Sequence, residues 1–136
     1  MELVVDSNCL ISALIRDGKS RELICSANLR LFAPDNLIIE ISKHKKEILQ
    51  RSGISEEDFS MLLMVLLSCV RVIPEVEFKS CKERAKKLVT HPEDIPFIAL
   101  ALAKQIPLWT NDKGLRKQSV IRTFSTSELL NLLGKA

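Results

Sequence analysis

Short apolar runs rich in β-branched residues alternate along the chain with longer stretches whose apolar residues recur at helical spacing. The runs that predict strands are residues 3–5, 31–33, 72–73, 107–110 and 120–123. A parallel connection needs a helix-sized crossover, and the stretches between these runs are long enough to provide one. The pattern therefore predicts an α/β fold in three layers, with a mainly parallel sheet of about five short strands and helices on both faces.

The stretches between the strands predict helices of different character. Residues 34–50 predict one long amphipathic helix with Pro34 in its first turn, and residues 78–89 predict a basic amphipathic helix. Residues 59–70, preceded by Ser55 as a cap, are apolar around most of the helix circumference, so this helix is expected to be buried. Further helices are expected after residue 6 and over 92–103, and Ser125 with Glu128 forms a capping box ahead of the last helix.

Composition narrows the class of protein. A chain of 136 residues with 46% hydrophobic and 27% charged residues predicts one domain over residues 1–136 that folds unaided. The four cysteines form no CxxC motif, and Cys25 and Cys69 lie in segments expected to be helical core, which favours a reduced, cytoplasmic protein. The longest apolar run, 61–67, is far shorter than the roughly 20 residues that span a bilayer, and no export signal opens the chain, so we expect no membrane contact.

Acidic residues are expected at the carboxyl ends of the strands. Asp6 ends the first strand and Asp112 follows the fourth, and right-handed crossovers bring such strand ends to one edge of the sheet. Asp94 begins the apolar helix over 92–103, and Glu40 lies on the flank of the helix over 34–50. Four carboxylates around one cavity are the hard oxygen ligands that Mg²⁺ or Mn²⁺ prefers, which predicts metal-assisted phosphodiester hydrolysis.

Each acid alone also has an ordinary structural interpretation. Asp94 could cap a helix, Asp6 and Asp112 could form turns, and Glu40 could be solvated, so only the joint arrangement favours a metal site. His44, His91 and the cysteines lack the spacing of a zinc site, and both histidines are expected to lie at the surface. The sequence contains neither a GxSxG motif nor a phosphate-binding glycine loop, which excludes the acyl-transfer and P-loop chemistry associated with those motifs.

Three segments that carry these acids resemble motifs of a known family. Val-Val-Asp-Ser-Asn at 4–8 is similar to a hydrophobic-Asp-Thr/Ser-Asn opening, Asp-Ile-Pro-Phe-Ile-Ala-Leu-Ala at 94–101 resembles an Asp-x-x-hydrophobic-Ala-Leu-Ala helix, and Leu-Trp-Thr-Asn-Asp at 108–112 is similar to a Thr-x-Asp ending. These are motifs of the PIN domains, a family that includes VapC-type ribonuclease toxins and archaeal RNA-processing nucleases. The resemblance covers nearly the whole chain and keeps the order of the motifs.

The resemblance implies a Mg²⁺- or Mn²⁺-dependent endoribonuclease that leaves a 5′-phosphate and a 3′-hydroxyl. It also implies that the catalytic and metal-binding residues are Asp6, Glu40, Asp94 and Asp112. Asn8 and Thr110 would be their polar supports. Glu47 lies on the same helix flank as Glu40, two turns later, and remains an alternative to it.

An RNA substrate needs cations near the acidic edge, and the net charge of +3 with a pI of about 8.7 permits a polyanionic partner. The expected RNA-binding residues are Arg16, Lys19, Lys113, Arg116 and Lys117. A second basic group, which could equally be a solvated helix face, comprises Lys79, Lys82 and Lys86. The few aromatic residues argue against a base-stacking platform.

Other partners and functions stay open at this point. The apolar run at 61–67 should leave an apolar face after the core is filled, so we expect a homodimer. The chain could be the toxin of a toxin–antitoxin pair, with an antitoxin as partner, or an RNA-processing enzyme. A catalytically weak or silent PIN-fold binding module is the main alternative. A receiver domain would need an aspartate after the third strand, and Pro74 stands there instead.

Overall fold

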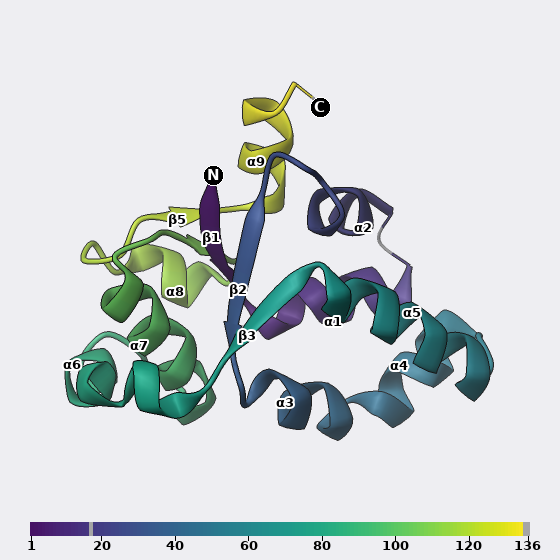
Figure 1. The fold of residues 1–136 in the computed structure, drawn as a ribbon, viewed down its shortest axis with the longest axis horizontal. Coiled ribbons are helices and arrows are strands. Elements are labelled where there is room, and N and C mark those ends of the chain that lie inside the picture. The colour runs from purple at the N-terminus through teal and green to yellow at the C-terminus, as the bar shows by residue number, and fades with distance from the viewer. Residues whose placement is uncertain (17, 135–136) are drawn as a thin grey trace.

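Five parallel strands form one sheet in the part of the chain that the computed structural model describes, residues 1–16 and 18–134 (Figure 1). Their bounds are β1 (Glu2–Val5), β2 (Arg30–Pro34), β3 (Val70–Ile73), β4 (Leu108–Trp109) and β5 (Thr123–Phe124). The strand order is β3-β2-β1-β4-β5, and every neighbouring pair is parallel. The α/β class and the parallel sheet predicted from the apolar runs are confirmed.

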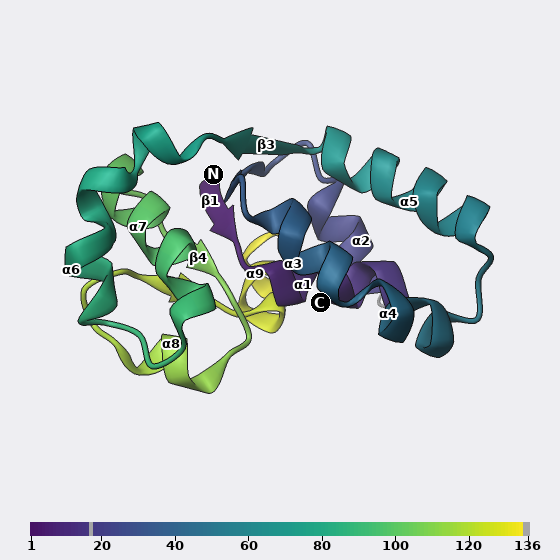
Figure 2. The same cartoon turned by 90° about the horizontal axis from the view of Figure 1, so that it is seen from below.

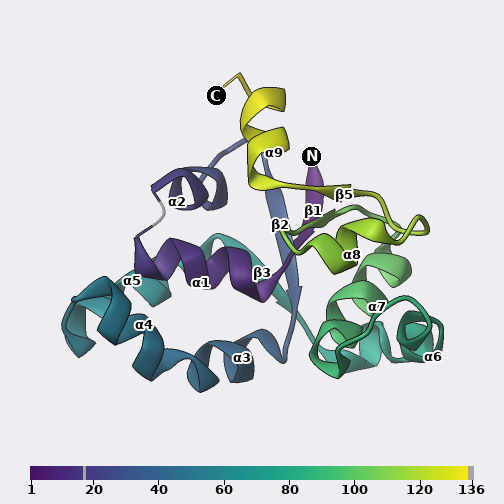
Figure 3. The same cartoon turned by 180° about the vertical axis from the view of Figure 1, so that it is seen from behind.

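Helices cover both faces of this sheet, as predicted (Figures 2 and 3). Their bounds are α1 (Ser7–Ile15), α2 (Gly18–Ile24), α3 (Leu37–Lys43), α4 (Lys45–Ser52), α5 (Glu56–Ser68), α6 (Lys82–Lys86), α7 (Ile95–Lys104), α8 (Lys113–Lys117) and α9 (Thr126–Leu132). Short 3₁₀ turns lie at η1 (Glu75–Glu77), η2 (Lys79–Cys81) and η3 (Pro92–Asp94). Helices α6 and α7 lie on one side of the sheet, and α1, α3 and α4 lie on the other.

The strand order creates a switch point beside β1. The chain builds β1, β2 and β3 on one side and then returns to add β4 and β5 on the other side of β1. In open α/β sheets the crevice for a ligand lies at such a point, outside the carboxyl ends of the strands. Asp6 follows β1 and Asp112 follows β4 by a few residues, so both acids lie at this switch point.

Burial on both faces of the sheet explains the continuous apolar runs. Leu3, Val4 and Val5 of β1 are fully buried between the helix layers. Helix α7 is buried from Phe97 to Ala101, and it contacts β1, β2 and β4. This packing anchors the start of α7, where Asp94 lies, near the carboxyl end of β1.

The single helix expected over 34–50 is wrong in two respects. Pro34 belongs to β2, where it pairs with Ile73 of the edge strand, instead of starting a helix. The helical segment is also divided at His44, whose N–H bonds to Ile41 O, three residues back, at 3.1 Å. Because α3 and α4 both contact α1, the turn at His44 lets the chain follow the surface of α1.

The expected burial of the helix after Ser55 is also wrong. Ser55 does cap it, accepting the Asp58 N–H at 3.1 Å, but α5 lies at the β3 edge, where its main contacts are with α1 and β3. Within α5 only Phe59 and Leu66 are buried. The residues left outside, Met61, Met64 and Val65, are 67%, 72% and 55% exposed, and we call them the α5 apolar face. No helix in the described ranges has both the length and the apolar character needed to cross a membrane.

Two further elements differ from the prediction for local reasons. The basic helix expected over 78–89 shrinks to η2 and α6, because α6 buries only Ala85 and so has little packing to extend it. The strand expected over 120–123 starts at Thr123, because the Gln118 side chain accepts the N–H groups of Val120 and Ile121. Those backbone groups are therefore satisfied by a side chain instead of a neighbouring strand.

A candidate carboxylate site at the carboxyl end of the sheet

Asp6 is held at the junction of β1 and α1. The Asp6 N–H donates to Trp109 O of β4 at 2.9 Å, and Asp6 is only 2% exposed. The Thr110 hydroxyl donates to Asp6 Oδ2 at 2.7 Å. The backbone N–H groups of Ser7 and Asn8 in the first turn of α1 also lower the pKa of this carboxylate. Asp6 therefore has a fixed position at the bottom of the crevice.

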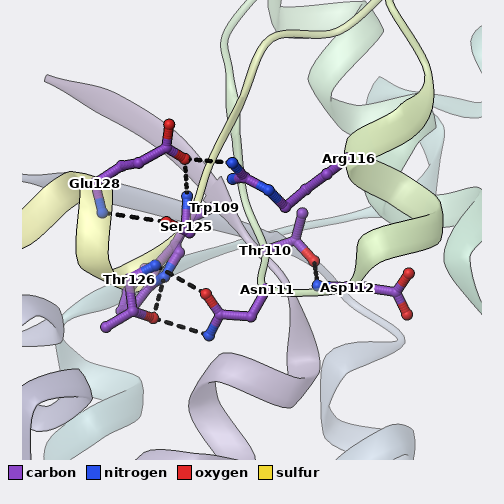
Figure 4. Close-up of polar contacts among 8 residues, drawn as sticks. All are labelled: Trp109, Thr110, Asn111, Asp112, Arg116, Ser125, Thr126 and Glu128. Atoms are coloured by element: carbon purple, nitrogen blue, oxygen red, sulfur yellow. Dashed lines mark hydrogen bonds and ion pairs between the residues drawn. The ribbon is translucent and has the colours of Figure 1, made fainter.

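Thr110 links this buried acid to the loop that carries Asp112. It is fully buried, and the pairing of Val5 with Trp109 places it beside Asp6. Its hydroxyl oxygen donates to Asp6 and accepts the Asp112 N–H at 3.0 Å, the contact drawn in Figure 4. The support predicted for Thr110 therefore has a geometric basis in two hydrogen bonds.

The loop between β4 and α8 is anchored on its other side by α9 (Figure 4). Asn111 Nδ2 donates to Thr126 Oγ1 at 2.9 Å, and the Thr126 N–H donates to Asn111 Oδ1 at 2.8 Å. The Trp109 indole N–H also donates to Thr126 Oγ1, at 3.1 Å. Sequence reasoning missed Asn111 because its partner lies 15 residues away and neither residue has a motif of its own.

Asp94 and Asp112 approach the same crevice from two helix starts. Asp112 caps α8, since its Oδ1 accepts the Leu115 N–H at 3.0 Å, and it is otherwise exposed. Asp94 stands at the N-cap position of α7, is half-buried, and makes no side-chain cap hydrogen bond. The side chain of Asp94 therefore does not cap α7, which was its alternative interpretation from the sequence.

The electrostatics show that the three aspartates lie within reach of one another. Burial raises the pKa of Asp6, the Thr110 hydrogen bond opposes this rise, and the negative charge of Asp112 adds to it. Burial first, and then the negative charges of Asp6 and Asp112, together raise the pKa of Asp94 to about 6. Three of the four predicted acids thus interact through their charges, although they come from segments up to 106 residues apart.

A small cavity of about 220 Å³ opens beside two of these acids. It is lined by Asp94, Asp112 and Lys117, together with Leu88, Val89, Thr90, Gly114 and Leu115. A Cβ on Gly114 would lie 3.0 Å from Asp112 Oδ1, so a larger residue would crowd the carboxylate. The cavity therefore combines two carboxylates with one cation and enough room for a small group.

The chain is similar in sequence to one known protein family. A family model described as PIN domain matches residues 4–131, nearly the whole chain. The chain belongs to the PIN domain family. PIN domains are generally nucleases, and the family includes toxins of toxin–antitoxin pairs.

Solved structures with the same fold resemble this PIN domain. PAE2754 from Pyrobaculum aerophilum is 17% identical with a TM-score of 0.73, and the match covers 100% of this chain and 91% of that one. VapBC2 from Rickettsia felis, bound to a DNA fragment from its promoter, is 14% identical with a TM-score of 0.66, and the match covers 92% and 98%. A search of curated proteins found no match. At these identities the likeness concerns the fold.

The two candidate glutamates of this PIN domain, Glu40 and Glu47, form ion pairs with cationic side chains of their own helical segment. Glu40, with a side chain 12% exposed, pairs with Lys43 at 3.4 Å. Glu47 pairs with His44 and Arg51, each at 3.4 Å. Neither glutamate is among the charges that shift the pKa of Asp6 or of Asp94. These interactions do not choose between Glu40 and Glu47, and the fourth acid of the set stays a prediction.

A second, more open cavity of about 430 Å³ lies between α1 and α4. It is lined by Asn8, Arg16, Glu47 and Arg51, with Ile11, Ser12, Ile15 and His44. The side chain of Asn8 is exposed and lines this cavity, while its backbone N–H supports Asp6. Arg51 was not predicted from the sequence as a residue of this cavity, although its spacing of four residues from Glu47 is a signal for a helical ion pair.

The predicted RNA-binding residues fall into two classes. Lys113 and Lys117 are exposed on α8, and Arg16 and Lys19 are exposed on the α1 side. Arg116 instead donates to Glu128 at 2.6 Å, and Glu128 also accepts the Ser125 N–H in the capping box, so Arg116 ties α8 to α9 (Figure 4). In the second basic group, Lys82 and Lys86 form ion pairs with Glu75 and Glu83, which partly neutralises that surface.

The donor chemistry of the crevice suits a hard divalent cation. Asp6, Asp94 and Asp112 would be the residues to hold it, and Mg²⁺ is commonly bound by one or two carboxylates with several waters. Within residues 1–16 and 18–134, however, no three His, Cys, Asp or Glu side chains are already close enough to hold one ion together. The aspartates thus fit the cation by chemistry and charge, without forming a closed ligand cage.

Asp94→Asn should change how the stability of the metal-free protein depends on pH. A carboxyl group whose pKa rises from 3.8 to about 6 on folding contributes most below pH 4, and this contribution is lost as pH rises through about 6. The variant and the wild type should therefore melt alike near pH 4, and the variant should melt higher at pH 7. Thermal denaturation in chelator at several pH values measures this, and a difference that does not vary with pH would contradict it.

Proposed function

We propose that this PIN domain is a Mg²⁺- or Mn²⁺-dependent endoribonuclease. The observation that supports this most is the group Asp6, Asp94 and Asp112 at the switch point, where burial, with a further contribution from the neighbouring negative charges, raises the pKa of Asp6 and of Asp94. Carboxylates that repel one another at a ligand crevice are stabilised when a divalent cation binds between them. Glu40 or Glu47 would complete the acidic set.

Each aspartate would have a distinct role in this proposal. Asp6 is held by Thr110 and by the first turn of α1, so it would provide a fixed oxygen ligand. Asp94, with a pKa of about 6, can exchange a proton near neutral pH and would lose it when a cation binds. Asp112 would be oriented toward the cation by its position at the start of α8. A bound divalent cation would supply Lewis acidity toward the phosphodiester and its attacking water.

The proposed RNA path runs from α8 across the crevice to the α1–α4 cavity. Lys117 lines the small cavity beside Asp94 and Asp112, and Lys113 is exposed next to it. Arg16 and Arg51 line the cavity on the other side, with Lys19 nearby in sequence. Cations flanking an acidic centre would bind the phosphates that the carboxylates repel. The choice of RNA and of 5′-phosphate products rests on the resemblance to the family.

The cellular role could follow either of two patterns. One similar structure is VapBC2 bound to promoter DNA, which supports an antitoxin as partner and a toxin role for this chain. An RNA-processing nuclease without an antitoxin is the other pattern. In both, an RNA substrate implies a cytoplasmic protein.

A catalytically weak or silent PIN-fold binding module is the second candidate function. Two observations favour it: the described residues contain no preformed group of three metal-binding side chains, and both glutamates pair with cations on their own helices. The carboxylates would then form part of a binding surface, and the protein would not cleave RNA. The activity measurements below separate the two functions.

A second copy of the chain is proposed to cover the α5 apolar face. Met61, Met64 and Val65 are each more than half exposed on one helix, next to partly buried Leu62 and Leu63. A contiguous apolar surface of this kind typically marks an interface, and a twofold pairing would bury it symmetrically. Helix α5 lies at the edge of the molecule (Figure 2), so pairing through it would leave the crevice open.

Removing any one aspartate should abolish most cleavage. Asp6→Asn, Asp94→Asn and Asp112→Asn should each reduce the rate on RNA with Mg²⁺ or Mn²⁺ by about 100-fold or more, because each keeps the side-chain shape and loses the charge. Asp58→Asn, in the exposed first turn of α5, is the matched control and should keep full activity. Circular dichroism should be native for all four variants.

The same assay places the fourth acid and tests the alternative. Loss of activity in Glu40→Gln with activity kept in Glu47→Gln would assign Glu40, and the reverse would assign Glu47. Full activity in an aspartate variant would exclude that residue. A pure wild-type protein that cuts neither structured nor single-stranded RNA with either metal would favour the silent module.

Metal should stabilise the wild type much more than Asp112→Asn. At about 100 times its dissociation constant, Mn²⁺ should add roughly 2.7 kcal/mol to the free energy of unfolding of the wild type. In chelator, Asp112→Asn should melt higher than the wild type, because the charge that raises the pKa of Asp94 is removed while asparagine can still cap α8. Equal metal responses in melting experiments would argue against a shared site.

The protein should sediment as a dimer at tens of micromolar, and Met64→Lys should make it monomeric. A charge on the α5 apolar face would be buried without a partner in the interface. Val76→Lys is the control, since Val76 is 81% exposed outside α5 and should not affect association. Sedimentation of the wild type as a monomer only would end this proposal.

A further inference from the structure

Two cysteines that are distant in sequence lie side by side in the structure. The sulfur atoms of Cys25 and Cys69 are 3.8 Å apart, although the residues are separated by 44 positions. The sequence placed both in helical core, and this is wrong: Cys25 is exposed just after α2, and Cys69 is half-buried at the end of α5. Their spacing showed no pairing because the contact depends on how the two helix ends meet.

The pair lies at the end of the sheet opposite to the carboxylate crevice. Cys25 precedes β2 and Cys69 precedes β3, and these neighbouring parallel strands pair from Leu31 and Val70 onward. Parallel strands begin at one edge of the sheet and end at the other. Chemistry at the two cysteines is therefore separate from that at Asp6, which follows the carboxyl end of β1.

We propose that Cys25 and Cys69 are a modification site, a dithiol that exchanges with a low-molecular-weight disulfide to form an intrachain disulfide. The thiolate of Cys25 attacks one sulfur of the external disulfide, forms a mixed disulfide and releases one small thiol. The thiolate of Cys69 then attacks the Cys25 sulfur and displaces the second small thiol. The two cysteines are oxidised, the external disulfide is reduced to two thiols, and the cysteine protons pass to the departing thiolates.

The geometry of the pair suits this reaction. A disulfide bond is about 2.05 Å long, so the sulfurs need to approach by less than 2 Å, which side-chain rotation at two helix ends can supply. The exposed thiol of Cys25 is open to an external disulfide, whereas Cys9 is 1% exposed. Burial and the neighbouring Cys69 raise the pKa of Cys25, so Cys25 is mainly thiol at neutral pH and gives up its proton in the exchange.

The bond would close a loop that contains β2, α3, α4 and α5. A cross-link over such a loop restricts the unfolded chain more than the folded one. For about 44 residues this predicts a rise in melting temperature of about 5 to 15 °C. The crevice lies at the other edge of the sheet, so any nuclease activity should be unchanged at temperatures where both forms are folded.

The test uses the full chain, reduced and then incubated with oxidised glutathione. The expected product is a monomer about 2 Da lighter with two fewer alkylatable thiols, in which a peptide containing Cys25 is linked to one containing Cys69. It should melt higher than the reduced protein and return to the reduced melting temperature with dithiothreitol. Mass measurement of the wild type needs no variant and no activity, so its outcome is independent of the proposed nuclease function.

Variants identify the two sulfurs. Cys25→Ser and Cys69→Ser should each lose the 2 Da change and the rise in melting temperature, while Cys81→Ser, half-buried near α6, should keep both. A lasting glutathione adduct on Cys25, a covalent dimer, or a cross-link that survives in Cys25→Ser would each overturn the proposal.

Discussion

The parallel pairing of β1 with β4 is the contact on which the candidate site depends. It sets Val5 opposite Trp109, so that Asp6, which follows β1, lies beside Thr110, which follows β4. The 2.7 Å hydrogen bond between these two side chains is fully enclosed, where a polar group without a partner would be destabilising. Burial of the strands on both faces thus fixes one carboxylate at the switch point of the sheet.

Around that fixed acid, the structure holds an electrostatic conflict. The fold places Asp94 and Asp112 at the starts of α7 and α8, and burial together with the charges of Asp6 and Asp112 raises the pKa of Asp94 to about 6. Structural ion pairs elsewhere in the chain have the opposite character, as in the Arg116–Glu128 pair that ties α8 to α9. Carboxyl groups whose pKa is raised by burial and by neighbouring charges cluster at functional sites, which makes this crevice the candidate site.

The two ends of the sheet have different chemistry. The carboxyl end carries the aspartates, the small cavity and the basic residues of α8, whereas the amino end carries the adjacent thiols of Cys25 and Cys69. Helix α5, which carries the α5 apolar face, lies next to the edge strand β3. A disulfide, a second copy of the chain and a divalent cation could therefore each act on this PIN domain at a separate place.

The sequence by itself determined those features that depend on a few neighbouring residues. The apolar runs of the buried strands, the Ser55 cap, the Ser125 capping box and the acids at strand and helix ends were all readable because their signals are local. Tertiary structure decided the turn at His44, the later start of β5, the exposure of α5 and the approach of Cys25 to Cys69. Each of these depends on where segments pack in space, on a single side chain such as Gln118 taking backbone partners, or on which helix faces the sheet leaves uncovered, and no short stretch of sequence specifies that.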